Sequence, residues 1–178
     1  PVAIAGPGTW DYSTLSATTG TEGQSEPLCD QFGSVAVAKD IWFEWTATES
    51  GYATVQTCSL ADHDTKIAAY PGAGCPADGT AVACNDDTCV LSSLIQFAVQ
   101  SGSIYTLQVG CYSEAAGLGS IQIGISGSGG VANDDCANAE PITGEGVFPY
   151  DNALATTEGI TPSCVSVGAD VWFAWTSP

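Results

Sequence analysis

The sequence predicts an all-β fold, an antiparallel β-sandwich of the jelly-roll or immunoglobulin-like type, and three observations support this prediction. Apolar and polar residues alternate in segments of five to seven residues, which is the pattern of strands with one buried face. Clusters of Gly, Pro, Asn and Asp separate these segments at short intervals. No stretch of even ten residues shows the three- and four-residue spacing of an amphipathic helix.

The alternation is clearest in four segments, in chain order 53–57, 95–99, 104–109 and 121–125. Upstream of them, Trp42 and Trp45 are three positions apart, so they face opposite sides of one strand. One of the two indoles must therefore lie in the core, and a neighbouring layer can cover the other. Core packing is the favoured interpretation of the tryptophans, and a sugar-stacking platform is the alternative.

An internal repeat divides the chain. The sequence DIWFEWT at 40–46 returns as DVWFAWT at 170–176, with five of the seven positions identical. Two further markers match in the same order: ATT at 17–19 and 155–157, and Cys29 and Cys164.

These markers predict three segments. Residues 1–126 form a near-complete sandwich unit, 127–130 a Gly/Ser linker, and 131–178 an incomplete second unit. We expect the second unit to be completed by another chain or by the rest of a tandem array, because its aromatic strand has no later strands to pack against. The residues predicted to lie in that assembly contact are Val171, Trp172, Phe173 and Trp175.

Composition excludes several classes of function. The chain has twenty acidic residues and only two basic ones, Lys39 and Lys66, which gives a net charge of −18. It therefore cannot neutralise nucleic-acid phosphates or anionic lipid headgroups. No apolar run reaches the length of a membrane span, so no membrane insertion is expected. His63 is the only histidine, and no G-x-S-x-G motif accompanies it, so the chain is not predicted to be an enzyme.

The even number of cysteines predicts disulfides and an extracellular or cell-surface location. No C-x₂-C pair favours zinc instead. The short loop between Cys75 and Cys84 makes that pair the first candidate. The eight candidates are Cys29, Cys58, Cys75, Cys84, Cys89, Cys111, Cys136 and Cys164.

Acidic loops raise the question of a bound cation. Asp62, Asp64, Asp86 and Asp87 offer the oxygen ligands that calcium prefers, and they flank segments expected to be neighbouring strands. The alternative interpretation is that these residues form turns and add solubilising charge, since no EF-hand spacing is present. Calcium is the only cofactor that the sequence suggests.

A family resemblance rests on several of these motifs taken in shifted order. NDDCANA (133–139), DVWFAWT (170–176), DHDTKIAAYPGAGC (62–75) and CNDDTC (84–89) are together similar to pre-peptidase C-terminal (PPC) domains of large secreted bacterial proteins, abundant in planctomycete-like genomes. The resemblance implies a β-sandwich, usually non-catalytic, that is attached to secreted hydrolases or repeated in tandem. Cys111 departs from the pattern, which typically has glycine there.

The resemblance also implies two cysteine pairs, Cys58 with Cys89 and Cys136 with Cys164. Cys29 corresponds to Cys164, so its partner would be a cysteine before residue 1, or else Cys111 or another chain.

The sequence as a whole predicts a structural, self-associating extracellular module that builds a fibre, filament or surface array from β-sandwich repeats. Its partners would be copies of itself or adjacent repeats. The alternative is a non-catalytic accessory module of a secreted hydrolase that binds calcium or carbohydrate.

Overall fold

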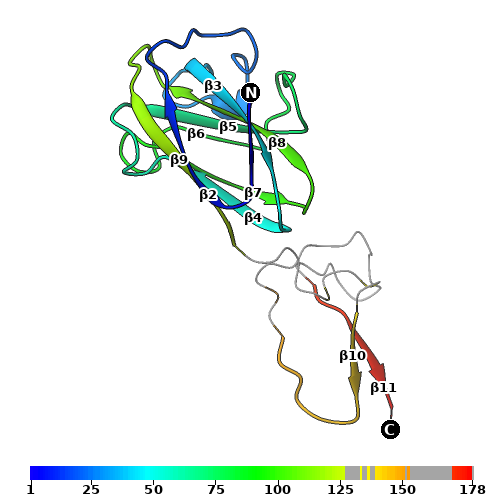
Figure 1. The fold of residues 1–178 in the computed structure, drawn as a ribbon. Helices are drawn as coiled ribbons and strands as arrows, with labels where there is room; N and C mark the ends of the chain where they lie inside the picture. The colour runs from blue at the N-terminus through cyan, green and yellow to red at the C-terminus, as the bar shows by residue number, and fades with distance from the viewer. Residues whose placement is uncertain (127–132, 134–135, 137–138, 151, 153–169, 178) are drawn as a thin grey trace. The chain divides into compact units, whose positions relative to one another are not determined.

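The computed structural model describes residues 1–126, 133, 136, 139–150, 152 and 170–177. The chain divides into two compact units, Pro1–Ser126 and Gly127–Pro178, and Figure 1 shows their strands.

The first unit is a sandwich of two β-sheets, which confirms the predicted fold class (Figure 1). Apart from a parallel β1–β3 pair, all neighbouring strands are antiparallel. The five-stranded sheet has the order β1 (Val2–Ala5), β3 (Ala38–Thr46), β8 (Ile104–Cys111), β5 (Thr65–Pro71) and β6 (Ala83–Asn85). The four-stranded sheet has the order β2 (Gly8–Ser13), β9 (Leu118–Ser126), β4 (Gly51–Gln56) and β7 (Leu94–Val99).

The core lies between the two sheets and contains the alternating apolar residues that the sequence indicates. In β7, for example, Ile95, Phe97 and Val99 are buried while the residues between them are exposed. The aromatic centre of this core is Trp45, which is completely buried and packs against Phe97 and Tyr105. Because these residues come from three strands in both sheets, their burial holds the layers together.

The outer face of the five-stranded sheet is also covered, which the alternation alone does not indicate. Gln108 alternates with apolar neighbours and reads as a solvent-facing residue, yet it is fully buried. Its amide donates to the Asp40 carboxylate at 2.9 Å and accepts from the Tyr70 hydroxyl at 3.1 Å. A second apolar cluster, with Cys29, Val37 and Tyr70 among its members, lies on this face.

The two tryptophans of β3 divide between these layers as predicted. Trp45 faces the core, whereas Trp42 packs in the outer cluster with its ring centroid 6.1 Å from that of Tyr70. The short 3₁₀ helix η1 (Pro27–Cys29) contributes Cys29 to the same cluster.

Two disulfides brace the first unit. One joins Cys58 to Cys89, the pair that the family resemblance implies. The other joins Cys29 to Cys84, so the prediction that Cys84 pairs with Cys75 is wrong. Cys84 lies opposite Ala68 in the β5–β6 register, facing the outer cluster where Cys29 is buried. Cys75 lies beyond the paired part of that hairpin and is exposed.

Cys111 is buried with its sulfur 3.6 Å from the Thr14 hydroxyl, so it is not the partner of Cys29. The predicted Cys136–Cys164 pair involves Cys164, which lies outside the described residues. Among the residues that the structure describes, no helix has the length and apolar character needed to cross a membrane.

The disulfide pattern predicts a distinct set of reactive thiols. We expect peptide mapping without reduction to recover the Cys29–Cys84 linkage, and Cys75 to react with an alkylating reagent in the native protein while Cys111 reacts only after unfolding. Replacing Cys29 and Cys84 by serine should lower the free energy of unfolding by about 2–4 kcal/mol. Recovery of a Cys75–Cys84 linked peptide would contradict the structure.

The covered outer face predicts an asymmetry between two glycines that both have a positive φ. A Cβ at Gly23 would collide with the Gln108 amide oxygen and lie 2.7 Å from the Tyr70 hydroxyl, whereas one at Gly33 would meet nothing within 4 Å. Backbone strain is shared by Gly23→Ala and Gly33→Ala, so the difference between them reports packing. We expect Gly23→Ala to be the more destabilising by about 1–3 kcal/mol in denaturant unfolding; equal losses would show that the outer layer is loosely packed.

Candidate functional site: an acidic cluster and an exposed strand edge

An acidic cluster forms where β5 begins and β6 ends. Asp64 immediately precedes β5, and Asp86 and Asp87 follow β6. Because the two strands are antiparallel, with Ile67 opposite Asn85, these ends lie side by side. One carboxylate oxygen from each of the three aspartates lies within 4.8 Å of the other two.

Buried hydroxyl groups and a disulfide hold this end of the hairpin in place. The Ser93 hydroxyl lies 2.7 Å from the main-chain carbonyl oxygens of both Thr65 and Asp86, so it bridges the backbone beside the two acidic positions. The loop that contains Asp86 and Ser93 is also tied to the end of β4 by the Cys58–Cys89 disulfide. The carboxylates therefore project from fixed backbone rather than from a free loop.

The carboxylates of the cluster lack the hydrogen bonds that buried charges usually have. Asp86 is only 1% exposed, and neither of its carboxylate oxygens has a hydrogen-bond partner among the described residues. One oxygen of Asp64 and one of Asp87 are buried and without partners in the same part of the structure. Burial raises the pKa of Asp86 to about 6, and burial followed by the charge of Asp87 raises the pKa of Asp64.

A single lysine lies near the cluster. Lys66 is fully buried, and its ammonium donates to the Ser34 carbonyl oxygen at 2.8 Å and lies 5.6 Å from the ring centroid of Tyr112. Its charge lowers the pKa of Asp86, against the larger effect of burial. The ion pairs found within 4 Å among the described residues do not involve Lys66. Lys66 also interacts electrostatically with Asp30, so its single charge does not neutralise the three carboxylates of the cluster.

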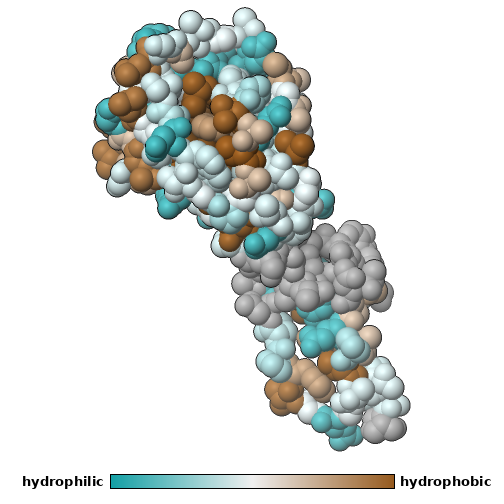
Figure 2. Space-filling view, viewed as in Figure 1, coloured by the Kyte–Doolittle hydropathy of each residue, from teal (hydrophilic) through white to brown (hydrophobic). Residues whose placement is uncertain are grey.

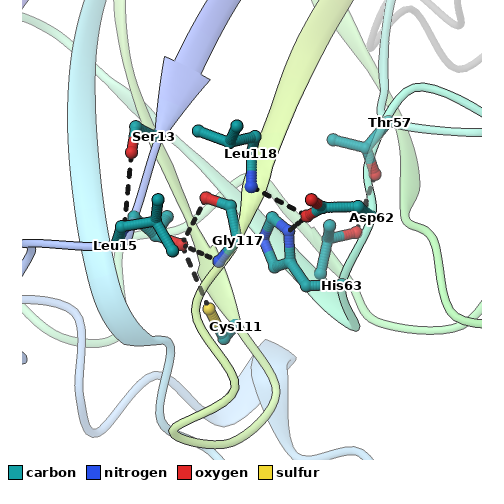
Figure 3. A network of polar contacts seen from close by, with 10 residues as sticks. Ser13, Leu15, Thr57, Asp62, His63, Cys111, Gly117 and Leu118 are labelled. Carbon is teal, nitrogen blue, oxygen red and sulfur yellow. Dashed lines mark hydrogen bonds and ion pairs between the residues drawn. The ribbon is translucent and has the colours of Figure 1, made fainter.

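Asp62, the fourth predicted cation ligand, lies apart from this cluster. Its carboxylate accepts a hydrogen bond from the Leu118 amide at 2.8 Å and lies 3.3 Å from Nδ1 of His63, as Figure 3 shows. The hydrogen bond from the Leu118 amide is the main reason that the pKa of Asp62 is lowered. Asp62 therefore fastens its loop to β9, and His63 packs edge-on against Tyr12 beside it. The sequence does not reveal this separation, because Asp62 and Asp64 are only two positions apart and both precede β5.

The second unit contains a strand pair that matches the opening of the first. Strand β10 (Glu140–Thr143) pairs in parallel with β11 (Phe173–Thr176), as β1 pairs with β3. The Trp175 indole donates to the Gly144 carbonyl at 2.7 Å, and the Trp45 indole donates to the Gly6 carbonyl at 2.9 Å. Both glycines have a positive φ, 78° and 65°. The two copies of the sequence repeat therefore share the same hydrogen bond, from a tryptophan indole to a glycine carbonyl oxygen.

The two copies differ in what covers them. Trp45 is completely buried, whereas Trp175 is 57% exposed. The far edge of β3 pairs with β8, but within the described residues β11 pairs with β10 alone. Figure 2 shows apolar side chains at the surface of the described part of this unit. Of the predicted assembly residues, Val171, Trp172 and Phe173 are half-buried and Trp175 is exposed.

The hydrogen bonds between β11 and β10 show which backbone groups of β11 point to its opposite edge. Trp172 and Thr176 use their carbonyl oxygens to accept from the amides of Glu140 and Gly144. Because successive residues of a strand point their backbone groups to opposite edges, the N–H and C=O groups of Phe173 and Trp175 face away from β10. No other described strand pairs with this edge, so it can accept one further strand.

Comparison with known proteins gives structural likenesses at low identity. No protein-family model matches the chain, and no curated protein matches its sequence. The pre-peptidase C-terminal domain of a collagenase from Bacillus anthracis is 10% identical, with a TM-score of 0.45 over 68% of this chain and 92% of that domain. CorA, a surface-associated copper-binding protein important in Methylomicrobium album BG8 copper acquisition, is 11% identical, with a TM-score of 0.41 over 71% of this chain and 100% of that one.

A third similar structure is the CBM36-1 domain of a multidomain xylanase from the hindgut metagenome of Trinervitermes trinervoides. It is 15% identical, with a TM-score of 0.30, and the match covers 67% of this chain and 99% of that domain. Likeness at these identities does not extend to ligand or activity.

The buried carboxyl of Asp86 predicts an unusual dependence of stability on pH in chelator-treated protein. Its pKa is about 6 in the folded state against 3.8 unfolded, so the folded state binds more protons between these values. Stability from this group is therefore present below pH about 4 and is lost as the pH rises through about 6. As the pH rises from about 4 to about 6, the free energy of unfolding of Asp86→Asn, measured with denaturant, should increase relative to that of the wild type.

Asp62 gives the control of opposite sign. Its pKa is lowered in the folded state, so its contribution is present above the unfolded value and is lost as the pH falls below about 4. The difference in free energy of unfolding between the wild type and Asp62→Asn should therefore stay constant between pH 4 and 6. A flat difference between the wild type and Asp86→Asn over that range would show that Asp86 is solvated.

Proposed function

We propose that the chain is a structural, self-associating extracellular module that builds a fibre, filament or surface array, and that copies or repeats join by adding a strand to β11. The observation that carries this proposal is the pair of equivalent tryptophans. Trp175 makes the same hydrogen bond as Trp45, but it keeps 57% of its surface exposed where Trp45 is enclosed by a completed sandwich.

The first unit supplies the template for the missing contact. Beside β3, strand β8 runs antiparallel with Leu107 opposite Phe43 and Tyr105 opposite Trp45. Phe173 and Trp175 occupy the equivalent positions in β11, with their backbone groups on the open edge. A strand added there would satisfy those groups and enclose the indole, and full burial of one large apolar side chain contributes about 1.5–3 kcal/mol.

Location and charge fit an assembly outside the cell. The two disulfides of the first unit are typical of oxidising, extracellular surroundings. A net charge of −18 makes copies repel one another at low ionic strength. Assembly should therefore strengthen as salt screens this repulsion.

The acidic cluster favours the second candidate function, an accessory module of a secreted hydrolase that binds calcium or carbohydrate. Such a module should remain monomeric and bind a polymer or an ion through its first unit. The two candidates therefore differ in oligomeric state.

A charged substitution on the open face should prevent assembly of the full chain. Trp175→Lys removes the exposed indole and places an ammonium on the edge of β11, where lysine disfavours strand pairing. Val147→Lys is the matched control, because Val147 is 97% exposed and lies outside both strands of the second unit. Sedimentation velocity and negative-stain microscopy should show polymers for the wild type and for Val147→Lys, but monomers for Trp175→Lys.

Two results would reject this proposal. The wild-type chain could stay monomeric across protein concentration and salt, or Trp175→Lys could assemble as readily as Val147→Lys. Thermal unfolding of all three proteins should be measured in parallel, because the first unit must remain intact for the comparison to report the interface.

A further inference from the structure

We propose that Asp64, Asp86 and Asp87 bind one divalent cation that prefers oxygen ligands, with calcium as the best match. This site is independent of the strand edge in the second unit, because all its residues lie in the first.

The observation that points to a ligand is the state of Asp86. Asp86 is only 1% exposed, and both of its carboxylate oxygens lack hydrogen-bond partners in the described structure. Buried polar groups in folded proteins are almost always paired, and a buried ionised carboxylate without a partner is strongly unfavourable. The unpartnered oxygens of Asp64 and Asp87 lie beside it. Three side chains from two strand ends thus converge with unused acceptor capacity.

The distances and charge suit a divalent ion. Calcium binds oxygen at about 2.3–2.6 Å, so two of its ligands are separated by at most about 5 Å. The three ligand atoms lie within 4.8 Å of one another, inside that limit. Lys66 can offset at most one of the three carboxylate charges and is shared with Asp30, so the cluster keeps a negative charge that a divalent cation would neutralise.

Lys66 does not replace the cation. Its ammonium is directed to the Ser34 carbonyl and the face of Tyr112, and it makes no ion pair within 4 Å with the described carboxylates. A lone ammonium also cannot occupy the centre of three converging oxygens while it is held elsewhere.

The chemistry of the ligands selects the class of ion. Carboxylates favour hard cations such as calcium, magnesium and manganese, whereas copper and zinc are usually held with nitrogen or sulfur ligands. Three carboxylates with remaining positions open to water or carbonyl oxygens suit the flexible six- to eight-fold coordination of calcium better than the rigid octahedron of magnesium. A bound ion would fasten the start of β5 to the turn after β6, next to the Cys58–Cys89 disulfide.

The test is a calcium titration of the full chain after removal of metals, in buffer containing sodium chloride near physiological ionic strength. Calorimetry should give saturable binding of about one calcium per chain, with a dissociation constant of about 10⁻⁴–10⁻³ M or tighter, as in other extracellular modules. Calcium should raise the melting temperature more than magnesium does, and more than sodium does at matched ionic strength. Charge screening alone would give the same increase for all three ions at matched ionic strength.

Four variants locate the site. Asp86→Asn and Asp64→Asn each remove one ligand charge and should weaken calcium binding at least about tenfold. Glu49→Gln removes the same charge from an exposed position outside the cluster, and Asp62→Asn removes the neighbouring carboxylate. Both should bind calcium within about twofold of the wild type.

Asp64→Asn keeps the test decisive if Asp86→Asn folds poorly, because Asp64 is only half-buried. The proposal is overturned if the wild type shows no saturable binding at millimolar calcium, or if sodium at matched ionic strength stabilises it equally. It is also overturned if Asp62→Asn weakens binding as much as Asp64→Asn does. None of these outcomes depends on whether the chain assembles.

Discussion

The hydrogen bond from the Trp45 indole to the Gly6 carbonyl fixes how the chain enters the sandwich. It joins the end of β1 to β3 and places the largest core side chain between the two sheets, where Phe97 and Tyr105 enclose it. The parallel register of β1 and β3 and the antiparallel register of β3 and β8 both converge on this residue. A buried indole with its N–H satisfied allows a large apolar area to be enclosed without an unpaired donor. The same bond at Trp175 and Gly144 shows that the second unit begins in the same way.

The first unit has three layers rather than two, and this arrangement positions the acidic cluster. The segment that contains η1 covers the outer face of the five-stranded sheet and brings Cys29 to Cys84. As a result, β5 and β8 are buried on both faces. Burial lowers the pKa of Lys66 in β5, and burial raises the pKa of Asp86 after β6. Carboxylates in such surroundings need a partner charge. The cation proposed at Asp64, Asp86 and Asp87 would supply it.

Much of the fold could be predicted from the sequence, because alternation is a direct consequence of one buried face. Residues 95–99 and the opposite orientations of Trp42 and Trp45 are examples. The outer layer could not be predicted, since Gln108 reads as a polar, solvent-facing residue until Tyr70 and Asp40 are placed beside it. The Cys29–Cys84 disulfide could not be predicted for the same reason: loop length favours Cys75, whereas Cys84 faces the outer cluster in which η1 buries Cys29.

The candidate site shows the same limit. Composition identified the aspartates, but only the β5–β6 register brings Asp64 to Asp86. Pairing of the preceding loop with the start of β9 places Asp62 beside Leu118. The repeated DVWFAWT sequence predicted that Trp175 would be equivalent to Trp45. The equivalence of their hydrogen bonds and the contrast in their exposure depend on strand pairing and packing, which the repeat alone does not specify. The sequence repeat predicts where the strand lies. The segments that pack beside the strand determine which partners pair with its edges.

Amide hydrogen exchange along β11, in assembled and in dispersed protein, tests the central claim most directly. The backbone groups of Ala174 point toward β10, whereas those of Phe173 and Trp175 point to the open edge. Addition of a strand predicts that the Phe173 and Trp175 amides exchange rapidly in dispersed protein and become protected on assembly, while Ala174 is protected in both. Rapid exchange of Phe173 and Trp175 in assembled material would show that copies do not join through this edge.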